Sequence, residues 1–375
     1  MSYKRRRQED TKNQRAGGSG DKRPRRRRRP RKKHLYLVLD DWKKGYSIHK
    51  IDPDTFDDSD DEEEHHSRHL PEPPALRLEP PVSRVPDPHT RVSFAALGTK
   101  LFALMNHRCG LVYDAGTAVL SLGAHTPAQI ACGFGVSVAA GDVLYVLSSD
   151  RSYFDTENPQ SFAAMSWGPT SPDAMGYPTE GWSWKALPPP PFESHVRATA
   201  LHPDGRTIFV TSTDDERRKC TYSFDTVDSA WRCHENWALP FLGHGHFDAE
   251  LDAWVGMDMD GHVCAGRVVS PGFRSFYPDW YCKKTEEKMF SKRRSMGASL
   301  TYMGASNFCL VDCVVAKHAD RRPAFARHDG FVIKLTVFGL KYNHRGELQI
   351  KHHRSTRSFL VSRHMCDFAP KAFWV

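Results

Sequence analysis

The stretch from Val196 to Pro240 constrains the fold of this chain most strongly. It contains four short segments with strand character, joined in series by turns. His202-Pro203-Asp204-Gly205 has turn chemistry, and Gly205 is free to take a positive φ. The next segment, Thr207–Ser212, is rich in β-branched and aromatic residues, which suit a half-buried strand. These features predict one four-stranded antiparallel meander, with strands at 196–201, 207–212, 220–224 and 230–233.

The same order of segments recurs along the chain. Its turns fall at Gly98, Gly141, Gly205, Glu250 and Gly304, which lie 43, 64, 45 and 54 residues apart. A polar insert at Glu157–Gly181 fills the longest gap, after an expected third strand at Tyr153–Asp155. Spacings of this size are typical of β-propeller blades. We therefore predict an all-β fold, a kelch-like β-propeller of five to six blades, with a β-sandwich of unrelated hairpins as the alternative.

The ordered part of the chain begins with a predicted hairpin, His34–Asp40 followed by Tyr46–Asp52. Propellers commonly pair an N-terminal strand with C-terminal strands, and this hairpin is the candidate for such closure. Residues 53–90 form an acidic and proline-rich insert, which we expect to be a solvated loop from residue 57 onward. The predicted domains are thus a tail at 1–33 and a propeller at 34–375.

A short signature occurs twice. Phe154-Asp155-Thr156 recurs as Phe224-Asp225-Thr226, and each copy is followed by a Trp and then by Leu-Pro. The pattern resembles the second half of a kelch repeat, in which the Asp caps a turn and the Trp packs between blades, although the paired glycines of a kelch blade are missing. The resemblance implies structural roles for Asp114, Asp155, Trp184, Asp225, Trp231 and Trp254.

Longer segments carry a resemblance to one family. They are LYLVLDDWKKGYSIHKID at 35–52, HFDAELDAWVGMDMDGHVCAGRVVSP at 246–271, ASLTYMGASNFCLVDCV at 298–314 and LTVFGLKYNHRGELQ at 335–349. Across about residues 34–375 the chain resembles a large plant family of unknown function, expanded in grasses such as rice, with a degenerate kelch-like propeller. The resemblance implies no catalytic residues.

The positive charge of the chain is concentrated at its N-terminus. Residues 1–33 hold 16 Lys/Arg against three acidic residues, a net +13, whereas the remaining 37 Lys/Arg and 42 acidic residues give −5. Such a segment is expected to be disordered. Its two basic clusters resemble a bipartite nuclear import signal; nucleic-acid binding through residues 1–33 and an inert tail are the alternatives. The candidate signal comprises Lys4, Arg5, Arg6, Arg7, Lys22, Arg23, Arg25, Arg26, Arg27, Arg28, Arg29, Arg31, Lys32 and Lys33.

Other features favour an intracellular protein that is not anchored in a membrane. The chain has no apolar run of about 18 residues, and its basic N-terminus lacks the apolar segment of a secretory signal. Nine cysteines are scattered without a disulfide framework, which suits reduced thiols.

Motifs for chemistry are sparse. His244-Gly245-His246, with Asp248 nearby, could offer two imidazoles on one strand face to a metal, but the sequence shows no third ligand. Cys309 and Cys313 lie in an apolar strand and are expected to be buried. We predict no cofactor, no metal and no catalytic residues.

The function predicted from these observations is that of a non-enzymatic scaffold or adaptor that binds a protein partner, located in the nucleus or alternatively in the cytoplasm. Association with nucleic acid through the tail, and an enzyme that uses a central pocket, are the competing hypotheses. Partner contacts are expected in the insert 157–181 and the loop 270–295. Within the latter, Lys283–Arg294 is the best helix candidate of the chain.

Overall fold

A computed structural model describes most of the chain beyond the basic tail. The described residues are 32–40, 45–56, 68–78, 92–105, 109–127, 130, 134–148, 161–192, 195–214, 216, 218–234, 237–272, 282–291, 295–315, 331–351, 355–361 and 370–375. The chain divides into two units, residues 1–32 and 33–375. Of the first, only Lys32 is described, so the predicted disorder of the tail and all but two of its candidate signal residues lie outside this part.

The described residues fold into β-strands and one short 3₁₀ helix, η1 (Pro53–Thr55). The all-β prediction is confirmed. None of the helices in the described residues has the length and apolar character needed to span a bilayer. The strands are β1 (Leu35–Asp40), β2 (Tyr46–Ile51), β3 (Arg68–His69), β4 (Leu76–Leu78), β5 (Val92–Leu97), β6 (Lys100–Met105), β7 (Cys109–Asp114), β8 (Val119–His125), β9 (Phe134–Ala140), β10 (Val143–Ser148), β11 (Phe162–Thr170), β12 (Thr179–Ala186), β13 (His195–Leu201), β14 (Thr207–Thr213), β15 (Lys219–Asp225), β16 (Ala230–Cys233), β17 (Leu242–Asp248), β18 (Ala253–Met257), β19 (His262–Arg267), β20 (Cys282–Lys288), β21 (Ser295–Gly304), β22 (Asn307–Val315), β23 (Phe331–Tyr342), β24 (Leu348–Ile350), β25 (Ser355–Val361) and β26 (Lys371–Trp374).

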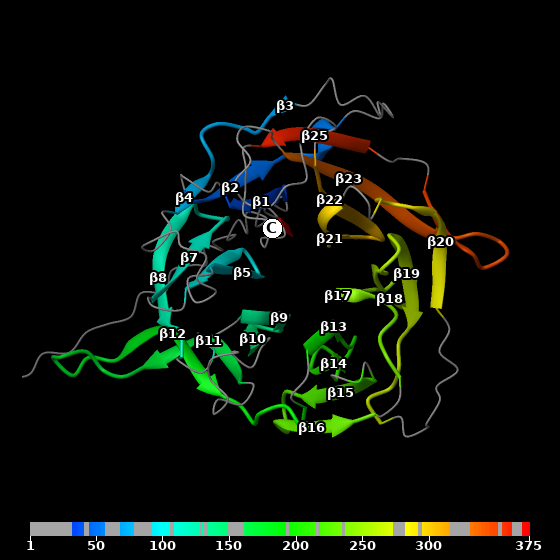
Figure 1. Cartoon of the computed structure of the whole chain (residues 1–375). Coiled ribbons are helices and arrows are strands. Elements are labelled where there is room, and N and C mark those ends of the chain that lie inside the picture. Colours follow the sequence, from blue (N-terminus) through cyan, green and yellow to red (C-terminus); the bar gives the residue numbers. More distant parts are fainter. Residues whose placement is uncertain are drawn as a thin grey trace, which may run out of the picture. The chain divides into compact units, whose positions relative to one another are not determined.

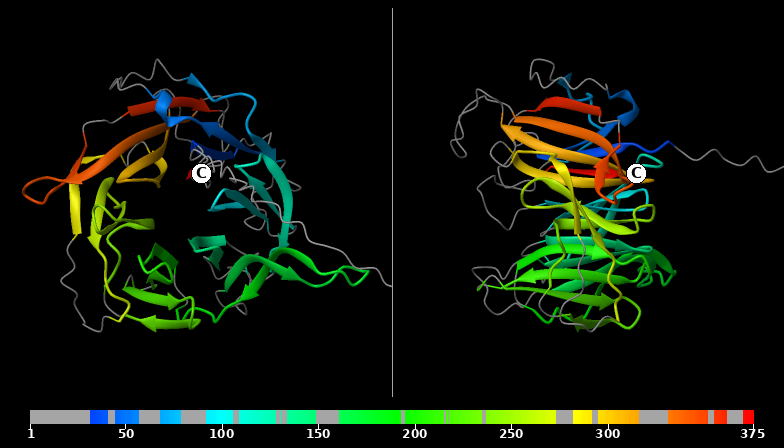
Figure 2. Two further views of the ribbon diagram at one scale, coloured as in Figure 1. Left: turned by 180° about the vertical axis from the view of Figure 1, so that it is seen from behind. Right: turned by 90° about the vertical axis from the view of Figure 1, so that its right-hand side faces the viewer.

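Four-stranded antiparallel meanders are the repeating element of residues 33–375. β5–β8 and β9–β12 each form a separate sheet, and β13–β16 and β17–β20 share one eight-stranded sheet because β13 and β17 pair in parallel. A further sheet contains β21, β22, β23 and β25, with β3 at its edge. The last has the order β26-β1-β2-β4. Within this unit the sheets follow one another around a common centre, a propeller-like arrangement (Figures 1 and 2).

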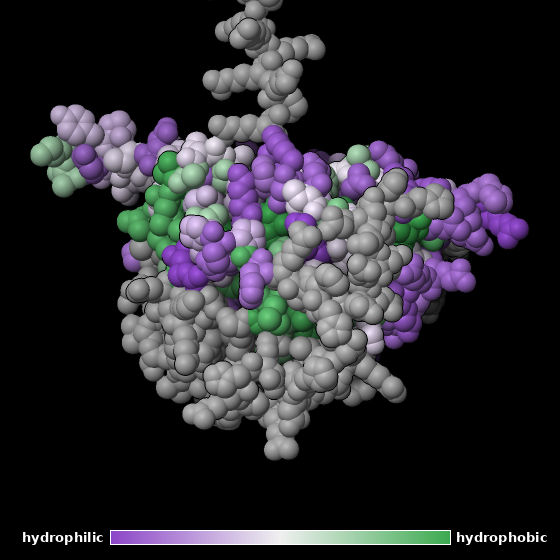
Figure 3. All heavy atoms as spheres, turned by 90° about the horizontal axis from the view of Figure 1, so that it is seen from above, coloured by the Kyte–Doolittle hydropathy of each residue, from purple (hydrophilic) through white to green (hydrophobic). Residues whose placement is uncertain are grey.

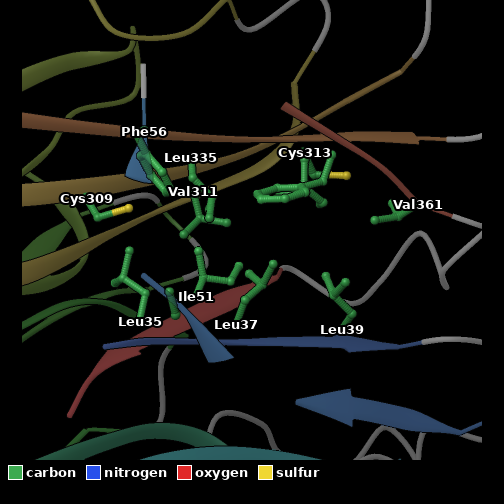
Figure 4. Packing of buried hydrophobic residues seen from close by; sticks show 13 residues of the cluster. Leu35, Leu37, Leu39, Ile51, Phe56, Cys309, Val311, Cys313, Leu335 and Val361 are labelled. Carbon is green, nitrogen blue, oxygen red and sulfur yellow. The ribbon is translucent and has the colours of Figure 1, made fainter. Parts of the chain in front are cut away.

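The core lies between neighbouring sheets. Strand β1 shows how: Leu35, Leu37 and Leu39 enter one apolar cluster with β22, β23 and β25, whereas Tyr36 and Val38 enter another with β5–β7. Figure 4 shows the first cluster, in which the leucines of β1 face Val311 and Cys313 of β22. Burying one such side chain stabilises the fold by about 1.5–3 kcal/mol. A strand that is apolar at every position therefore belongs between two sheets.

The two ends of the described unit meet in one sheet. Strand β26 pairs antiparallel with β1, in a register that places Lys371 opposite Val38 and Trp374 opposite Leu35. The backbone groups of His34 and Val375 add two further hydrogen bonds, of 2.8 and 3.1 Å. The predicted N-terminal hairpin is thus present as β1 and β2, and its first strand contacts the C-terminal strand.

The predicted meander at 196–233 matches β13–β16 closely. Its first turn contains Gly205 at φ +72°, the left-handed conformation expected for it. The equivalent turn of β17–β18 places Asp252 at φ +48° instead, a conformation that Asp tolerates better than most residues. A missing glycine therefore does not interrupt the repeat.

The helix predicted at Lys283–Arg294 is wrong. Residues 282–288 form strand β20, which pairs with β19, and Ser295 already belongs to β21. Thr285 points inward and is buried, while charged residues flank it on the exposed edge strand. Pairing along the edge of an existing sheet outweighs the weak helix preference of a Lys- and Glu-rich segment.

The polar insert predicted at Glu157–Gly181 is also wrong in large part. Phe162–Thr170 is strand β11 and pairs with β12 over eight residue pairs, from Ala163↔Ala186 to Thr170↔Thr179. The third strand of this sheet is therefore β11, and the residues proposed for it, 153–155, lie outside the described part. Gly and Pro at 168 and 169 concealed the strand pattern.

Residues 57–90 are not a loop throughout. Leu76–Leu78 forms β4 and pairs with β2, which completes a four-stranded sheet, and Arg68–His69 forms β3 beside β25. Leu78 is buried in the cluster shared with β5–β7. A three-residue strand amid prolines gives no periodicity from which it could be predicted.

Packing of β26 should contribute measurably to stability. Phe373 is half-buried against the cluster of Tyr36 and Val38, so Phe373→Ala should lower the free energy of unfolding by about 2 kcal/mol, below the range for a fully buried Phe. Urea denaturation monitored by Trp fluorescence measures this change. The control Val227→Ala, at a residue 70% exposed, should stay within about 0.5 kcal/mol of wild type. An equally small effect at Phe373 would contradict a stabilising role for β26.

Candidate functional site

Six strands lie nearest the centre of the unit, one from each four-stranded set. They are called here the inner strands: β26, β5, β9, β13, β17 and β21 (Figure 1). Hydrogen bonds that involve polar side chains link four of them, β13, β17, β21 and β26, in series. We call Thr199, His244, His246 and Lys371 the inner polar cluster.

The cluster is built by contacts from strand to strand. Thr199 of β13 is the register partner of His244 of β17, and its Oγ1 lies 3.1 Å from His244 Nδ1. Two residues on, His246 Nε2 donates to the Leu300 carbonyl of β21 at 3.1 Å. The two imidazole rings lie 4.8 Å apart, nearly perpendicular. As predicted, His244 and His246 lie on the same face of their strand.

Strand β21 connects this pair to Lys371. The Ser299 hydroxyl donates to the Pro370 carbonyl at 3.0 Å, and the Thr301 hydroxyl donates to the Ala372 carbonyl at 2.9 Å. Lys371 therefore lies between two residues whose carbonyls are held by β21, and the Leu300 carbonyl of the same segment accepts the hydrogen bond from His246. Residues 299–301 of β21 thus link the strand of Lys371 to the histidine pair.

Burial dominates the electrostatics of the cluster. His244, His246 and Lys371 are half-buried, and burial is the largest cause of the pKa shift of each. Burial, with smaller contributions from His246 and Lys371, lowers the pKa of His244 to about 3. Burial also lowers the pKa of His246, although its bond to Leu300 opposes the change, and it lowers the pKa of Lys371. Both imidazoles are consequently neutral near pH 7, and Lys371 has no hydrogen bond or ion pair within the described residues.

The residues predicted to be structural are dispersed and do not form one site. Asp225 ends β15 and accepts hydrogen bonds from the backbone of Val227 and Asp228, and Asp114 ends β7 and accepts one from Gly116 at 2.8 Å. Burial alone would raise the pKa of Asp114, but hydrogen bonds from Lys100 and Gly116 lower it. Asp155 lies outside the described residues.

The three tryptophans occupy separate cores. Trp231 of β16 donates to the Pro188 carbonyl at 3.0 Å and packs against Phe162 of the neighbouring sheet. Trp254 of β18 is fully buried and donates to the Leu201 carbonyl at 2.8 Å. Trp184 of β12 packs against a different cluster, which lies between its own sheet and that of β5–β8 and includes Phe102 and Leu144.

The cysteines singled out from the sequence are apolar core residues. Cys309 and Cys313 are buried in the cluster with β1, and burial raises the pKa of each thiol to about 12. Both thiols are therefore protonated near neutral pH. Among the described residues there is no group of three or more His, Cys, Asp or Glu arranged to hold a metal ion.

A second candidate feature lies on the outside of the unit. Six of the ten large hydrophobic side chains that are exposed in the described residues belong to β8 and the β11–β12 hairpin, and β12 lies beside β8. At the left edge of Figure 3 the projecting hairpin carries green as well as purple residues, whereas the hairpin of β23 and β24 at the right edge is mostly purple. We call this the β8–β12 surface: Val119, Leu120, Leu122, Trp167, Met175 and Tyr177.

The hairpin is held in a defined shape. The Asp173 carboxylate accepts hydrogen bonds from the backbone of Met175 and Tyr177, both at 2.9 Å, and the hydroxyls of Thr170 and Thr179 lie 2.7 Å apart. At its base, Trp182 makes edge contacts with Trp167 and with Phe102 of β6. Met175 and Tyr177, 84% and 65% exposed, are thus presented on a structured turn.

Comparison with known proteins assigns the chain to a family. The family described as "Protein of unknown function (DUF1668)" matches residues 32–359. The chain belongs to this family. The resemblance noted from the sequence is confirmed to the extent of a domain of unknown function, while the plant origin and the kelch type stay predictions. A search of curated proteins returned no match.

Several solved structures share a likeness in fold at low identity. TolB from Acinetobacter baumannii is 10% identical with a TM-score of 0.44, and the match covers 91% of this chain and 66% of TolB. A chain of a nidogen/laminin complex is 9% identical, TM-score 0.43, with coverage of 88% and 99%. The periplasmic gluconolactonase of Pseudomonas aeruginosa is 13% identical, TM-score 0.39, with the same coverages.

In this DUF1668 member, sequence reasoning found the histidines but missed Thr199, Lys371 and the β8–β12 surface. The one available signal for Lys371 was a single charge within the otherwise apolar C-terminal run APKAFWV. Thr199 gave no signal, because its role depends on the parallel register of β13 and β17.

The histidine pair predicts a loss of stability in acid. The folded pKa of His244, about 3, lies below the ordinary 6.5, so the unfolded chain binds more protons between these values. The stability contributed by the neutral ring is present above pH 6.5 and is lost as the pH falls toward 3. At pH 5 we expect a loss of roughly 1–2 kcal/mol from His244, reduced because the ring is partly accessible.

Urea denaturation at pH 7.5 and pH 5.0 measures this effect. His244→Asn should show the smaller decrease between the two pH values, whereas His344→Asn, at an exposed residue of the β23–β24 turn, should behave like wild type. Equal decreases in all three proteins would contradict the assignment to His244.

Proposed function

We propose that residues 33–375 are a six-bladed β-propeller that acts as a non-enzymatic scaffold for a protein partner. The blade count is supported by six four-stranded sets, β5–β8, β9–β12, β13–β16, β17–β20, β21-β22-β23-β25 and β26-β1-β2-β4. Pairing of β26 with β1 supports closure through the N-terminal hairpin. The adaptor interpretation and the kelch relationship belong to the same proposal.

The observation that carries the binding role is the β8–β12 surface. Exposed apolar side chains gathered on two adjacent elements mark interaction sites, whereas single exposed ones are ordinary. Strand β8 pairs with β7 on one side, and residues 119–122 are exposed on both faces of the strand. An edge of this kind accepts an extended peptide as an added strand. The partner we propose is a protein with an extended apolar segment that pairs with β8 and contacts the β11–β12 hairpin.

The non-enzymatic character is supported by the chemistry of the inner polar cluster. A general base works best with a pKa near the operating pH, and the pKa of His244 is about 3. The thiols of Cys309 and Cys313 are protonated and buried, which makes them poor nucleophiles. Rigid binding by surface residues fits these side chains better than proton transfer or covalent catalysis.

Charge on the β8–β12 surface should abolish partner binding. Leu122, 71% exposed, and Met175 can be changed to Asp without disturbing the core. Proximity labelling by the full chain in plant cells should recover its dominant partner at a level at least about tenfold lower for the Leu122→Asp, Met175→Asp protein. The matched control is Val227→Asp, which introduces a carboxylate at an exposed apolar residue of the β15–β16 turn.

Two outcomes would contradict this proposal. One is an unchanged set of labelled proteins in the double variant with an unchanged far-UV circular dichroism spectrum. The other is a wild-type dimer in light scattering that Leu122→Asp dissociates, because the occupant of the surface would then be a second copy of the chain.

We further propose that the basic residues of 1–33 direct the protein to the nucleus through an import receptor. Replacing Lys22, Arg23 and Arg25–Arg29 by Ala in a full-length fluorescent fusion should lower the nuclear-to-cytoplasmic ratio several-fold. Neutralising Lys341 and Arg345, exposed in the body, is the control. An unchanged ratio would contradict an import role. Salt-sensitive binding of a random RNA oligonucleotide that disappears with the same Ala replacements would favour the nucleic-acid alternative.

A further inference from the structure

The cation of the inner polar cluster is Lys371, and no described residue neutralises its charge. Lys371 has no ion pair or hydrogen bond within the described residues. Holding an ammonium away from water without a partner is costly, and folded proteins usually pair such charges. A half-buried lysine whose pKa is lowered by burial, with no partner among the described residues, therefore favours binding of a ligand or a compensating contact.

The charges around Lys371 leave it without a carboxylate. On the six inner strands the described acidic residue is Asp248, and its oxygens are engaged by the backbone N–H of Leu251 and Ser306 and by the Ser306 hydroxyl. In addition to the histidines of β13 and β17, the described basic residues of these strands are Lys371 and Arg197. Burial lowers the pKa of Lys371, and among the described residues no carboxylate opposes that effect. The inner wall is thus positive at the level of the cluster.

The neighbouring side chains can supply directional hydrogen bonds. His246 donates through Nε2 to Leu300, and His244 contacts Thr199 through Nδ1. When Thr199 donates to that nitrogen, the second nitrogen of His244 carries a proton and has no hydrogen-bond partner among the described residues. The charge of Lys371 acts on the His244 ring, and a neutral imidazole N–H together with an ammonium can supply the donors for an oxygen ligand.

We propose that Lys371 and His244, positioned by Thr199, His246 and β21, form a binding site for a compact oxyanion, a phosphate or a carboxylate. Lys371 provides the charge, and the His244 N–H orients the ligand. Thr199 holds the His244 ring, and β21 holds the backbone on either side of Lys371, which reduces the conformational entropy lost when the ligand binds. This site is distinct from the β8–β12 surface, and its test is independent of the protein partner.

The test measures thermal unfolding of the full chain with inorganic phosphate, malonate or chloride at matched ionic strength. Phosphate or malonate should raise the Tm by roughly 2 °C at ten times its Kd, while chloride should not. Lys371→Met should remove the response and, without anion, should raise the Tm because an unpaired cation is gone. Lys371→Arg should keep the response, and so should the matched control Lys341→Met, at an exposed lysine of β23.

The two anions distinguish the source of the oxygen atoms: a phosphate-only response identifies a tetrahedral ligand, and a malonate-only response a carboxylate. No response to either in wild type, or an unchanged response in Lys371→Met, would overturn the proposal. Where Lys371→Met does not fold, the imidazole ¹H–¹⁵N signals of wild type decide. The His244 signals, assigned with His244→Asn, should shift on adding the effective anion, and an unchanged spectrum at saturating phosphate and malonate excludes the site.

Discussion

Apolar packing on both faces of each sheet is the constraint on which the structure depends. In β1, alternate side chains enter two different clusters, one shared with β22, β23 and β25 and the other with β5–β7. The sheet of β13–β16 likewise shares one cluster with β9–β11 and another with β17–β19. A sheet that must be covered twice requires a neighbour on each side. The sheet of β26, β1, β2 and β4, which contains both the first and the last strand, has such a neighbour on each face.

The same constraint explains what the sequence could predict. Strands that face two clusters are apolar throughout or alternate clearly, and β13–β16 and the β1–β2 hairpin were found on that basis. Outer strands show a weaker apolar pattern, because one of their edges and part of each face are exposed to solvent. β20 (CKKTEEK) buries Thr285 alone among its residues, so composition suggested a helix. β11 begins with four buried residues but continues through Gly168 and Pro169, which conceal the pattern.

The candidate site was harder to predict than the fold because it arises between strands. Thr199 and His244 are 45 residues apart, and Lys371 lies more than 120 residues beyond His244. Their proximity depends on the parallel register of β13 with β17 and on two hydroxyl groups of β21 that hold β26. No periodicity in a single strand encodes these relations. The histidine pair is recognisable in the sequence because its two members share one strand, and two imidazoles on one strand face are typical of metal ligands.

On the inner strands, a lysine costs more stability than the other polar side chains do. Where strands converge, small side chains such as Ala198 and Ala200 suffice for packing, and a threonine or histidine can be satisfied by a neighbouring backbone carbonyl. A lysine cannot be satisfied in this way at low cost, since its charge persists when its hydrogen bonds are made. A methionine of similar length would keep the apolar contacts of the Lys371 stem and avoid the desolvation of an ammonium. Lys371 therefore lowers the stability of the unliganded protein. An anionic ligand bound beside it would offset this loss.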